Sequence, residues 1–146
     1  MIRVRPAVPG DAAALAEIEE KSTEQPWTEG QIEEELGYPF AVLLAAEIGD
    51  IPAGMLDMHV TAPAAYINEI SVDPGMRRQG IGTALLKAAL EECRKRGCNE
   101  ILLDVRSRNS GARSFYRKFG FTELCVRKNM YRDPDDDGIT MRYKID

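Results

Sequence analysis

A glycine-rich turn joins a strand-like segment to the most regular helical pattern in the chain. The turn consists of Arg77, Arg78, Gln79, Gly80, Ile81, Gly82 and Thr83. Glycines allow a tight backbone turn with outward-pointing N–H groups, and a helix N-terminus adds positive potential. The turn therefore predicts a phosphate-binding loop at a strand-to-helix junction. The alternative is a simple connecting turn. Arg77 and Arg78 argue against it, because cationic side chains beside the turn favour an anionic ligand.

Two common phosphate-binding motifs do not fit this turn. A P-loop requires Lys and then Ser or Thr after its second glycine, where this chain has Ile81 and Gly82. A dinucleotide-binding fingerprint requires a third glycine at the position occupied by Leu85. The sequence therefore predicts a phosphate-containing ligand held in neither of these two ways.

The apolar and polar pattern predicts the order strand, two helices, three strands, helix, strand, helix, two strands. The expected strands cover 2–5, 40–48, 51–60, 65–72, 100–106, 121–128 and 139–145. The expected helices cover 12–21, 28–36, 81–96 and 109–120. Asp11 and Thr28 are the predicted N-caps of the first two helices, and Thr28 opens a capping box with Gln31. This order predicts a mixed α/β sandwich in one domain, residues 1–146.

Histidine and cysteine counts limit the possible chemistry. His59 is the only histidine, so zinc sites with paired histidines are excluded and a catalytic triad would have to use His59. The three cysteines form no CxxC pair, which favours reduced thiols and a cytoplasmic protein. An acidic loop at 133–138 resembles the start of a calcium loop, but Lys144 replaces the required Glu, so we expect a solvated turn and no metal.

Charged residues are unevenly distributed along the chain. Acidic residues predominate in 1–60 and again in 131–146, whereas basic residues predominate in 61–130. The net charge of −5 argues against a nucleic-acid partner, and no apolar run approaches the ~18 residues of a membrane span. A basic middle is suited to an anionic ligand and an acidic front to a cationic one. Ordinary solvated surfaces are the alternative explanation.

Polar residues on predicted buried segments are candidates for catalysis. Asp104 interrupts an apolar strand, Tyr116 lies on the following helix, and Glu69 lies on the preceding strand. Asp104 is alternatively a structural residue paired with Arg106 or Arg108. A solvated strand surface would equally explain Glu69. Trp27, which follows Pro26, is either an exposed recognition residue or a lid over the core.

Taken together, these segments resemble the GNAT N-acetyltransferases. Arg77-x-x-Gly80-x-Gly82 resembles the acyl-CoA signature of this superfamily. Leu103-Asp104-Val105-Arg106, then Asn109, Phe115-Tyr116 and Phe119-Gly120-Phe121, resemble the bacterial ribosomal-protein alanine N-acetyltransferases (the RimI subfamily). Pro26-Trp27-Thr28-Glu29 and residues 127–131 extend the resemblance over nearly the whole chain. It implies a GNAT fold, in which about four helices flank a mixed, mostly antiparallel sheet of about seven strands.

The resemblance implies specific roles for residues of this chain. Strand-like backbone bonds to acetyl-CoA would come from Ile70, Ser71 and Val72, with the Val72 N–H facing the thioester oxygen. The loop from Arg77 to Thr83 would hold the pyrophosphate. Asn109 and Lys118 would complete the cofactor site. Tyr116 would be the general acid, and Trp27 and Tyr131 would contact the acceptor peptide. The subfamily has a Glu base where this chain has Asp104, so Glu69 or a bridging water is a possible substitute.

The implied reaction is direct acetyl transfer from acetyl-CoA to the N-terminal α-amine of a protein or peptide, with the N-terminal alanine of a ribosomal protein as the expected acceptor. An α-amine is partly neutral at pH 7, so a carboxylate base is sufficient and no metal is required. The acidic residues between Glu17 and Glu35 would suit a basic peptide. The alternatives are an acetyltransferase acting on lysine side chains or small amines, and a non-catalytic acyl-CoA-binding scaffold.

Overall fold

The computed structural model describes residues 1–146 and contains seven strands and four α-helices. The strands are β1 (Ile2–Pro6), β2 (Ala41–Ile48), β3 (Ile51–Thr61), β4 (Ala64–Val72), β5 (Glu100–Arg106), β6 (Thr122–Tyr131) and β7 (Asp136–Lys144). The helices are α1 (Ala12–Ser22), α2 (Glu29–Leu36), α3 (Ile81–Lys95) and α4 (Ser110–Phe119). Two short 3₁₀ turns, η1 (Pro9–Asp11) and η2 (Pro74–Met76), precede α1 and α3. The predicted order of strands and helices is confirmed.

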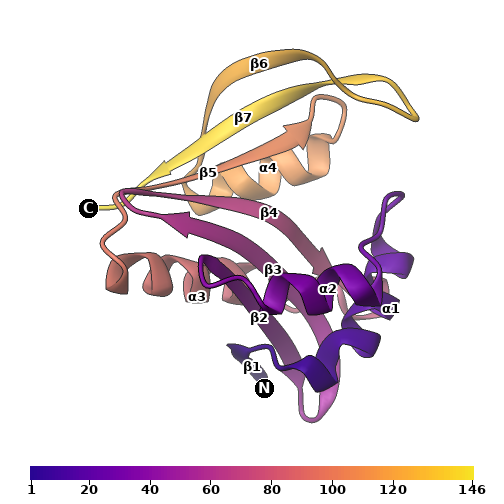
Figure 1. Ribbon diagram of the computed structural model, residues 1–146. Helices are drawn as coiled ribbons and strands as arrows, with labels where there is room; N and C mark the ends of the chain where they lie inside the picture. The colour runs from indigo at the N-terminus through magenta and orange to yellow at the C-terminus, as the bar shows by residue number, and fades with distance from the viewer.

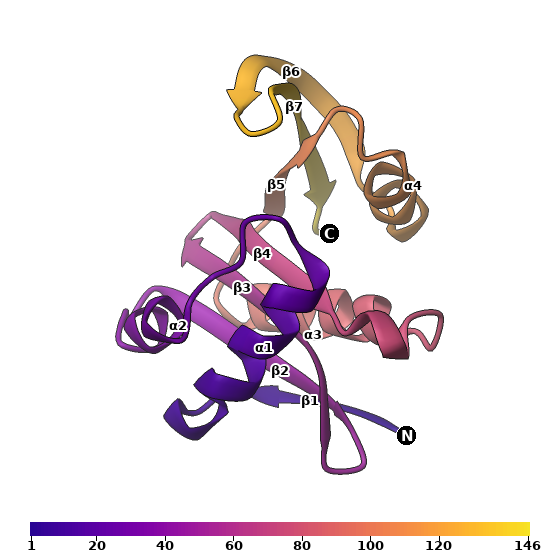
Figure 2. The ribbon, with the colours of Figure 1, turned by 90° about the vertical axis from the view of Figure 1, so that its right-hand side faces the viewer.

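All seven strands form one sheet in the order β1-β2-β3-β4-β5-β7-β6. Every pairing is antiparallel except that of β4 with β5, which is parallel and ends at Ile67 and Leu103. Beyond this pair the two strands diverge, so β1–β4 and β5–β7 open like the two arms of a V (Figures 1 and 2). The divergence leaves backbone edges of both strands without a strand partner.

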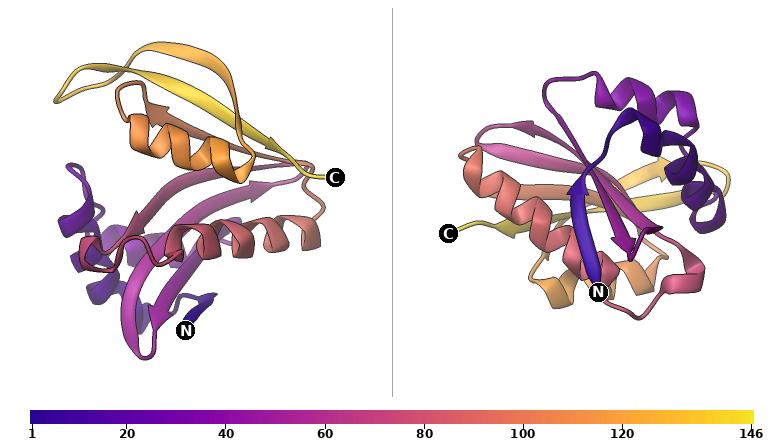
Figure 3. Two further views of the ribbon diagram at one scale, coloured as in Figure 1. Left: turned by 180° about the vertical axis from the view of Figure 1, so that it is seen from behind. Right: turned by 90° about the horizontal axis from the view of Figure 1, so that it is seen from below.

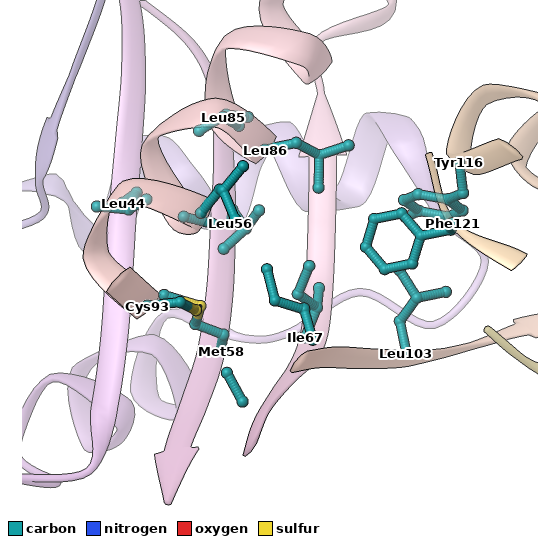
Figure 4. Close-up of a cluster of buried hydrophobic side chains, with 14 of the residues drawn as sticks. Leu44, Leu56, Met58, Ile67, Leu85, Leu86, Cys93, Leu103, Tyr116 and Phe121 are labelled. Atoms are coloured by element: carbon teal, nitrogen blue, oxygen red, sulfur yellow. The ribbon is translucent and has the colours of Figure 1, made fainter. Parts of the chain in front are cut away.

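Helices cover both faces of the sheet. Helices α1 and α2 pack on one face with a small core that includes Leu15, Ile32 and Met55. Helix α3 lies on the opposite face (Figure 3), where α3 and α4 share a larger core with the strands. In Figure 4, Leu85 and Leu86 of α3 pack near β3 and β4, while Tyr116 and Phe121 lie beside Leu103 of β5. This larger core holds the two arms together.

A β-bulge in β4 separates core residues from candidate site residues. Asp57 of β3 pairs with Glu69 and Met58 pairs with Ile67, so Asn68 is the extra residue. The bulge shifts by one position the alternation of β4 side chains between the two faces of the sheet. Ile67 and Ile70 therefore both belong to the α3 side, whereas Glu69 faces the α1 side together with the buried Ser71.

Of the two helix N-caps predicted from the sequence, Thr28 is confirmed and Asp11 is wrong. Thr28 accepts a hydrogen bond from Gln31 N at 3.1 Å, and the Gln31 side chain accepts one from Thr28 N. Asp11, however, does not cap α1. Its carboxylate accepts hydrogen bonds from the Arg5 guanidinium at 2.8 and 2.9 Å and from Val8 N instead, because it already belongs to η1. No helix is both long and apolar enough to cross a membrane.

Candidate active site

A cavity of about 610 Å³ lies where the end of β4 meets the starts of α3 and α4. Ten of the twelve predicted cofactor residues line it: Ile70, Ser71, Val72, Arg77, Arg78, Gly80, Ile81, Gly82, Thr83 and Asn109. We call this the donor cavity. Ser22, Met76, Gly111, Ala112, Phe115 and Tyr116 complete its wall.

The loop before α3 has a backbone that suits an anion. Arg78 and Gly80 have φ angles of +66° and +84°, a region in which consecutive N–H groups turn toward a common point. Helix α3 begins directly afterwards at Ile81, so its first N–H groups lack intrahelical partners. Gly82 lets Phe115 pack closely, because a Cβ there would lie 2.9 Å from Cζ of Phe115 and the ring would have to move. The exposed side chains of Arg77 and Arg78 add positive charge at the rim.

The divergence of β4 from β5 leaves two backbone donors directed into the donor cavity. Asp73 N–H donates to Ala53 O at 2.8 Å, which fixes the direction of the strand's hydrogen bonds. Because N–H directions alternate along a strand, the N–H groups of Ile70 and Val72 point away from β3, toward the open edge. An extended, amide-containing ligand can bind there as a strand would.

Two predicted cofactor residues lie outside the donor cavity. Gln79 does not line it. Lys118 lines a neighbouring cavity of about 490 Å³, which shares only Thr83 and Phe115 with the donor cavity. Lys118 sits on α4 about two turns beyond its first residue, Ser110, which explains the separation.

A second cavity, of about 600 Å³, lies on the α1 side of the sheet. We call it the acceptor cavity. Four predicted residues line it, namely Glu69, Asp104, Trp27 and Tyr131. Asn109, a predicted cofactor residue, also lines it, as do Glu24 of the acidic front and the two arginines considered as partners of Asp104, Arg106 and Arg108. The sequence did not single out its remaining polar residues: Ser22, Thr23, Gln25 and Asn68. Glu24 is the only member of the acidic 17–35 segment that lines it, and Glu19 of the same segment is completely buried.

A smaller cavity of about 250 Å³ connects the donor and acceptor cavities through the gap between β4 and β5. Tyr116 lines it together with the donor cavity, while Glu69 and Asp104 line it together with the acceptor cavity. Ser22 and Asn109 line all three. The strand divergence thus brings the three candidate catalytic residues to one passage.

Asp104 is held by two hydroxyl groups rather than by arginine. Tyr66 donates a hydrogen bond to Oδ2, and Thr140 donates one to Oδ1 at 2.5 Å. The Arg127 guanidinium donates in turn to the Thr140 hydroxyl at 3.0 Å. Burial and the neighbouring Asp104 raise the pKa of Tyr66, so this hydroxyl stays a donor.

The alternative pairing of Asp104 with Arg106 or Arg108 is wrong. Arg106 donates to the carbonyl oxygens of Arg132 and Pro134, and its guanidinium lies 4.6 Å from the ring centroid of Tyr131. Arg108 contacts Asp136 instead. Both arginines therefore fix the β6–β7 turn above the acceptor cavity and leave Asp104 free of a cationic partner.

Glu69 lies next to a buried carboxylate from α1. Glu19 accepts hydrogen bonds from the Ser71 hydroxyl and from Trp27 N at 2.9 Å. Burial, together with the neighbouring Glu19, raises the pKa of Glu69 to about 9. Glu69 therefore holds its proton at neutral pH. Glu19 could have been identified from sequence, because it follows Leu15 and Ile18 on the buried stripe of α1.

Tyr116 is buried where α4 meets the passage. Its ring packs edge-on against Phe121 at 5.6 Å between centroids. Burial, with a contribution from Glu69, raises the pKa of Tyr116. The hydroxyl therefore remains protonated at any physiological pH. In a proton-transfer step it can serve as a general acid but not as a general base.

The two predicted peptide-contacting residues flank the acceptor cavity from opposite arms. Trp27 is half-buried: it packs against the small core beneath α1 and α2 and also lines the acceptor cavity. It is therefore partly a lid over the core and partly accessible for recognition, the two alternatives that the sequence left open. Tyr131, at the end of β6, comes from the other arm. Tyr66, Thr140 and Asn68 carried no sequence signal, since strand register alone brings them to the site.

The donor cavity combines a phosphate-binding loop with free strand N–H groups, and a passage between β4 and β5 connects it to the acceptor cavity. This arrangement is typical of a coenzyme A-dependent acyltransferase. The sequence profile of the acetyltransferase (GNAT) family matches residues 12–121, and the chain belongs to this family. It is an N-acetyltransferase that uses acetyl-CoA as the acetyl donor.

Alignments with relatives whose substrates are named cover most of the chain. It is 33% identical to the putative ribosomal protein bS18-alanine N-acetyltransferase of Bacillus subtilis over 132 residues, 90% of this chain and 87% of that protein. It is also 33% identical to the Escherichia coli ribosomal protein bS18-alanine N-acetyltransferase over 137 residues, 92% of each. The crystal structure of the Escherichia coli ribosomal-protein-S18-alanine N-acetyltransferase has a TM-score of 0.91 at 29% identity, covering 99% of this chain and 94% of that one. The expected GNAT fold is therefore confirmed.

Proposed function

We propose that residues 1–146 act as one domain that acetylates the N-terminal α-amine of a protein, with ribosomal protein bS18 beginning with alanine as the first candidate. The observation that carries this proposal is the passage between β4 and β5, where Glu69, Asp104 and Tyr116 meet between the two cavities. The printed substrate of the relatives supplies the candidate acceptor. The reaction would take place in the cytoplasm, where a ribosomal protein and acetyl-CoA are both present.

The donor cavity has the chemistry that coenzyme A requires. Arg77, Arg78 and the first N–H groups of α3 would hold the pyrophosphate. The N–H groups of Ile70 and Val72 would bind the extended pantetheine amides. Bound there, acetyl-CoA supplies an activated thioester. The Val72 N–H would then stabilise the negative charge that develops on the thioester oxygen.

Asp104 is the proposed general base. Burial beside the Glu19 carboxylate raises the pKa of Glu69, which favours its protonated form at pH 7 and makes it the weaker candidate for the base. Asp104 is the other carboxylate in the passage. Because Asp reaches about 1.5 Å less far than Glu, one C–C bond, a water carries the proton from the amine to Asp104. The acceptor α-amine has a pKa of ~7.7–8.0, so this transfer needs only a modest base.

Tyr116 is the proposed general acid. Tyr116 lines both the passage and the donor cavity, where the thiolate would leave. A thiol ordinarily has a pKa of ~8.5, well below that of a buried tyrosine. Burial in the donor cavity would also raise the pKa of the coenzyme A thiol, which narrows the difference between the two pKa values. Tyr116 can then protonate the sulfur as the bond from sulfur to the acetyl group breaks.

The proposal is tested with acetyl-CoA and three acceptors: bS18, an alanine-initiated bS18 peptide containing lysine, and the same peptide with a blocked N-terminus. We expect one acetyl group on the alanine nitrogen of the first two and none on the blocked peptide, as located by fragmentation mass spectrometry. Equal acetylation of the blocked peptide would show that lysine is the acceptor. Turnover of small amines only would overturn the protein substrate. Binding of acetyl-CoA without turnover of any acceptor would indicate a scaffold.

A further inference from the structure

Three side chains with metal-binding groups meet beneath α2, away from the two cavities. Glu35 comes from the last turn of α2, and Asp57 and His59 lie two residues apart on β3. One ligand atom from each lies within 4.8 Å of the others. His59 Nε2 is 2.6 Å from Glu35 Oε1 and 3.8 Å from Asp57 Oδ2. None of the three lines the donor or the acceptor cavity.

Asp57 is the unusual member of this cluster. Its side chain is 0% exposed. Oδ2 accepts a hydrogen bond from the Asn68 side chain at 3.2 Å, but Oδ1 has no hydrogen-bond partner. A buried carboxylate with an unpartnered oxygen is costly, since nothing replaces the water it loses. The other two members of the cluster, the Glu35 carboxylate and the His59 imidazole, leave this oxygen without a hydrogen bond.

We propose that Glu35, Asp57 and His59 bind one divalent transition-metal ion of the Zn²⁺ type. One imidazole and two carboxylates provide three protein ligands, and water can occupy a fourth position. The imidazole disfavours Ca²⁺ and Mg²⁺, which prefer oxygen ligands alone. Two carboxylates balance the double positive charge. The site needs one histidine only, so the rarity of histidine in this chain does not exclude it.

The separations of the groups are close to those of a zinc site. Ligands bound at ~2.0–2.2 Å in a tetrahedral arrangement lie about 3.3 Å apart. The observed 2.6 and 3.8 Å lie on either side of this value, and the ligand atoms of Glu35 and Asp57 lie within 4.8 Å of each other, so shifts of about 1–1.5 Å bring all three pairs to it. The side chains of His59 and Glu35 are 33% and 14% exposed, which gives an ion a path from solvent. Phe40 packs edge-on against the imidazole at 4.8 Å and restricts its orientation.

Bound metal would tie α2 to β3 and so support the acceptor side of the sheet. Asp57 pairs in register with Glu69, and Asn68, its hydrogen-bond partner, is the bulged residue next to Glu69. The site takes no part in acetyl transfer. Its expected effect is on stability, because an ion that binds only the folded state raises the melting temperature.

The proposal is tested by titrating chelator-treated, chelator-free protein with ZnCl₂ in calorimetry and in competition with a zinc indicator. We expect one equivalent to bind and the melting temperature to rise. His59→Gln and Glu35→Gln, at partly exposed positions, should weaken binding about 100-fold or more. Asp57→Asn should do the same. Glu34→Gln is the matched control, since Glu34 contacts Tyr38 and not the cluster.

The absorption spectrum of bound Co²⁺ reports the geometry and the ligand atoms of the site, independently of how tightly the ion binds. Co²⁺ in this site should show tetrahedral ligand-field bands without a thiolate charge-transfer band, because no cysteine belongs to the cluster. Absence of Zn²⁺ binding by the folded wild-type protein would overturn the proposal. So would unchanged binding by the folded His59 and Glu35 variants, or a thiolate band, which would place the ion on Cys93, Cys98 or Cys125.

Discussion

Tyr66 of β4 donates its hydroxyl hydrogen bond to Asp104 of β5 at the point where the two strands separate. The last parallel pair is Ile67 with Leu103, so this bond joins the two strands next to the passage, which Asp104 lines. It fixes the Asp104 carboxylate, which is the proposed general base. Tyr66 is therefore proposed as a positioning residue for Asp104.

This relationship predicts different effects for Asp104→Asn and Tyr66→Phe. Loss of the base should lower kcat about 10²-fold or more, whereas loss of its positioning hydroxyl should lower kcat about 10-fold. The KM for acetyl-CoA should not change in either variant. Steady-state kinetics check this, with Tyr38→Phe as control, because Tyr38 is partly exposed and lines none of the three cavities. A larger loss in Glu69→Gln than in Asp104→Asn would reassign the base to Glu69.

Replacing Tyr116 with Phe removes the proposed proton donor and keeps the ring packing. We expect kcat to fall about 10²-fold, while calorimetry finds coenzyme A affinity unchanged. Tyr143→Phe is the matched control, because Tyr143 packs against Phe119 and Phe121 but lines neither main cavity. Equal turnover by both variants would remove Tyr116 from the mechanism.

The positive rim of the donor cavity should control acetyl-CoA binding. Arg78→Ala removes a charge beside the expected pyrophosphate, so KM for acetyl-CoA should rise about 10-fold and depend less on salt. KM for the peptide should not change. Arg96→Ala, at the other end of α3 where Arg96 pairs with Glu92, is the control and should behave as wild type.

Trp27 should matter for the acceptor and not for the donor. Trp27→Ala opens the wall of the acceptor cavity, so KM for the peptide should rise about 10-fold. Leu124→Ala removes an exposed apolar side chain outside this cavity and serves as control. A change confined to the KM for acetyl-CoA would contradict the placement of the peptide.

Glu69 should make the folded protein less stable as pH rises. Its pKa is about 9 when folded and near ~4.3 when unfolded, so between these values the folded state binds the extra proton. The contribution is fully present below the lower pKa and is lost as pH rises through about 9. Urea unfolding at pH 6 and pH 9 should show a smaller decrease for Glu69→Gln than for wild type. Glu33→Gln, at an exposed position of α2, should match wild type.

Local signals in the sequence are sufficient for much of this architecture. The capping box at Thr28, the Gly97 stop after α3 and the Asn109 cap of α4 each act within a few residues. The Asp11 cap was wrongly predicted because its carboxylate turns back to Arg5, a contact that cap statistics do not include. Lys118 lies in a separate cavity, since similarity of sequence does not fix the direction of a side chain.

The sequence by itself determined the order of elements and the glycine loop, because turns, caps and periodicity depend on neighbouring residues. Only the tertiary structure decided which carboxylates share the passage. The bulge at Asn68, the separation of β4 from β5, and the bonds of Tyr66 to Asp104 and Ser71 to Glu19 join residues far apart in the chain. Strand register sets such contacts, and burial among them raises the pKa of Glu69, which no local pattern encodes.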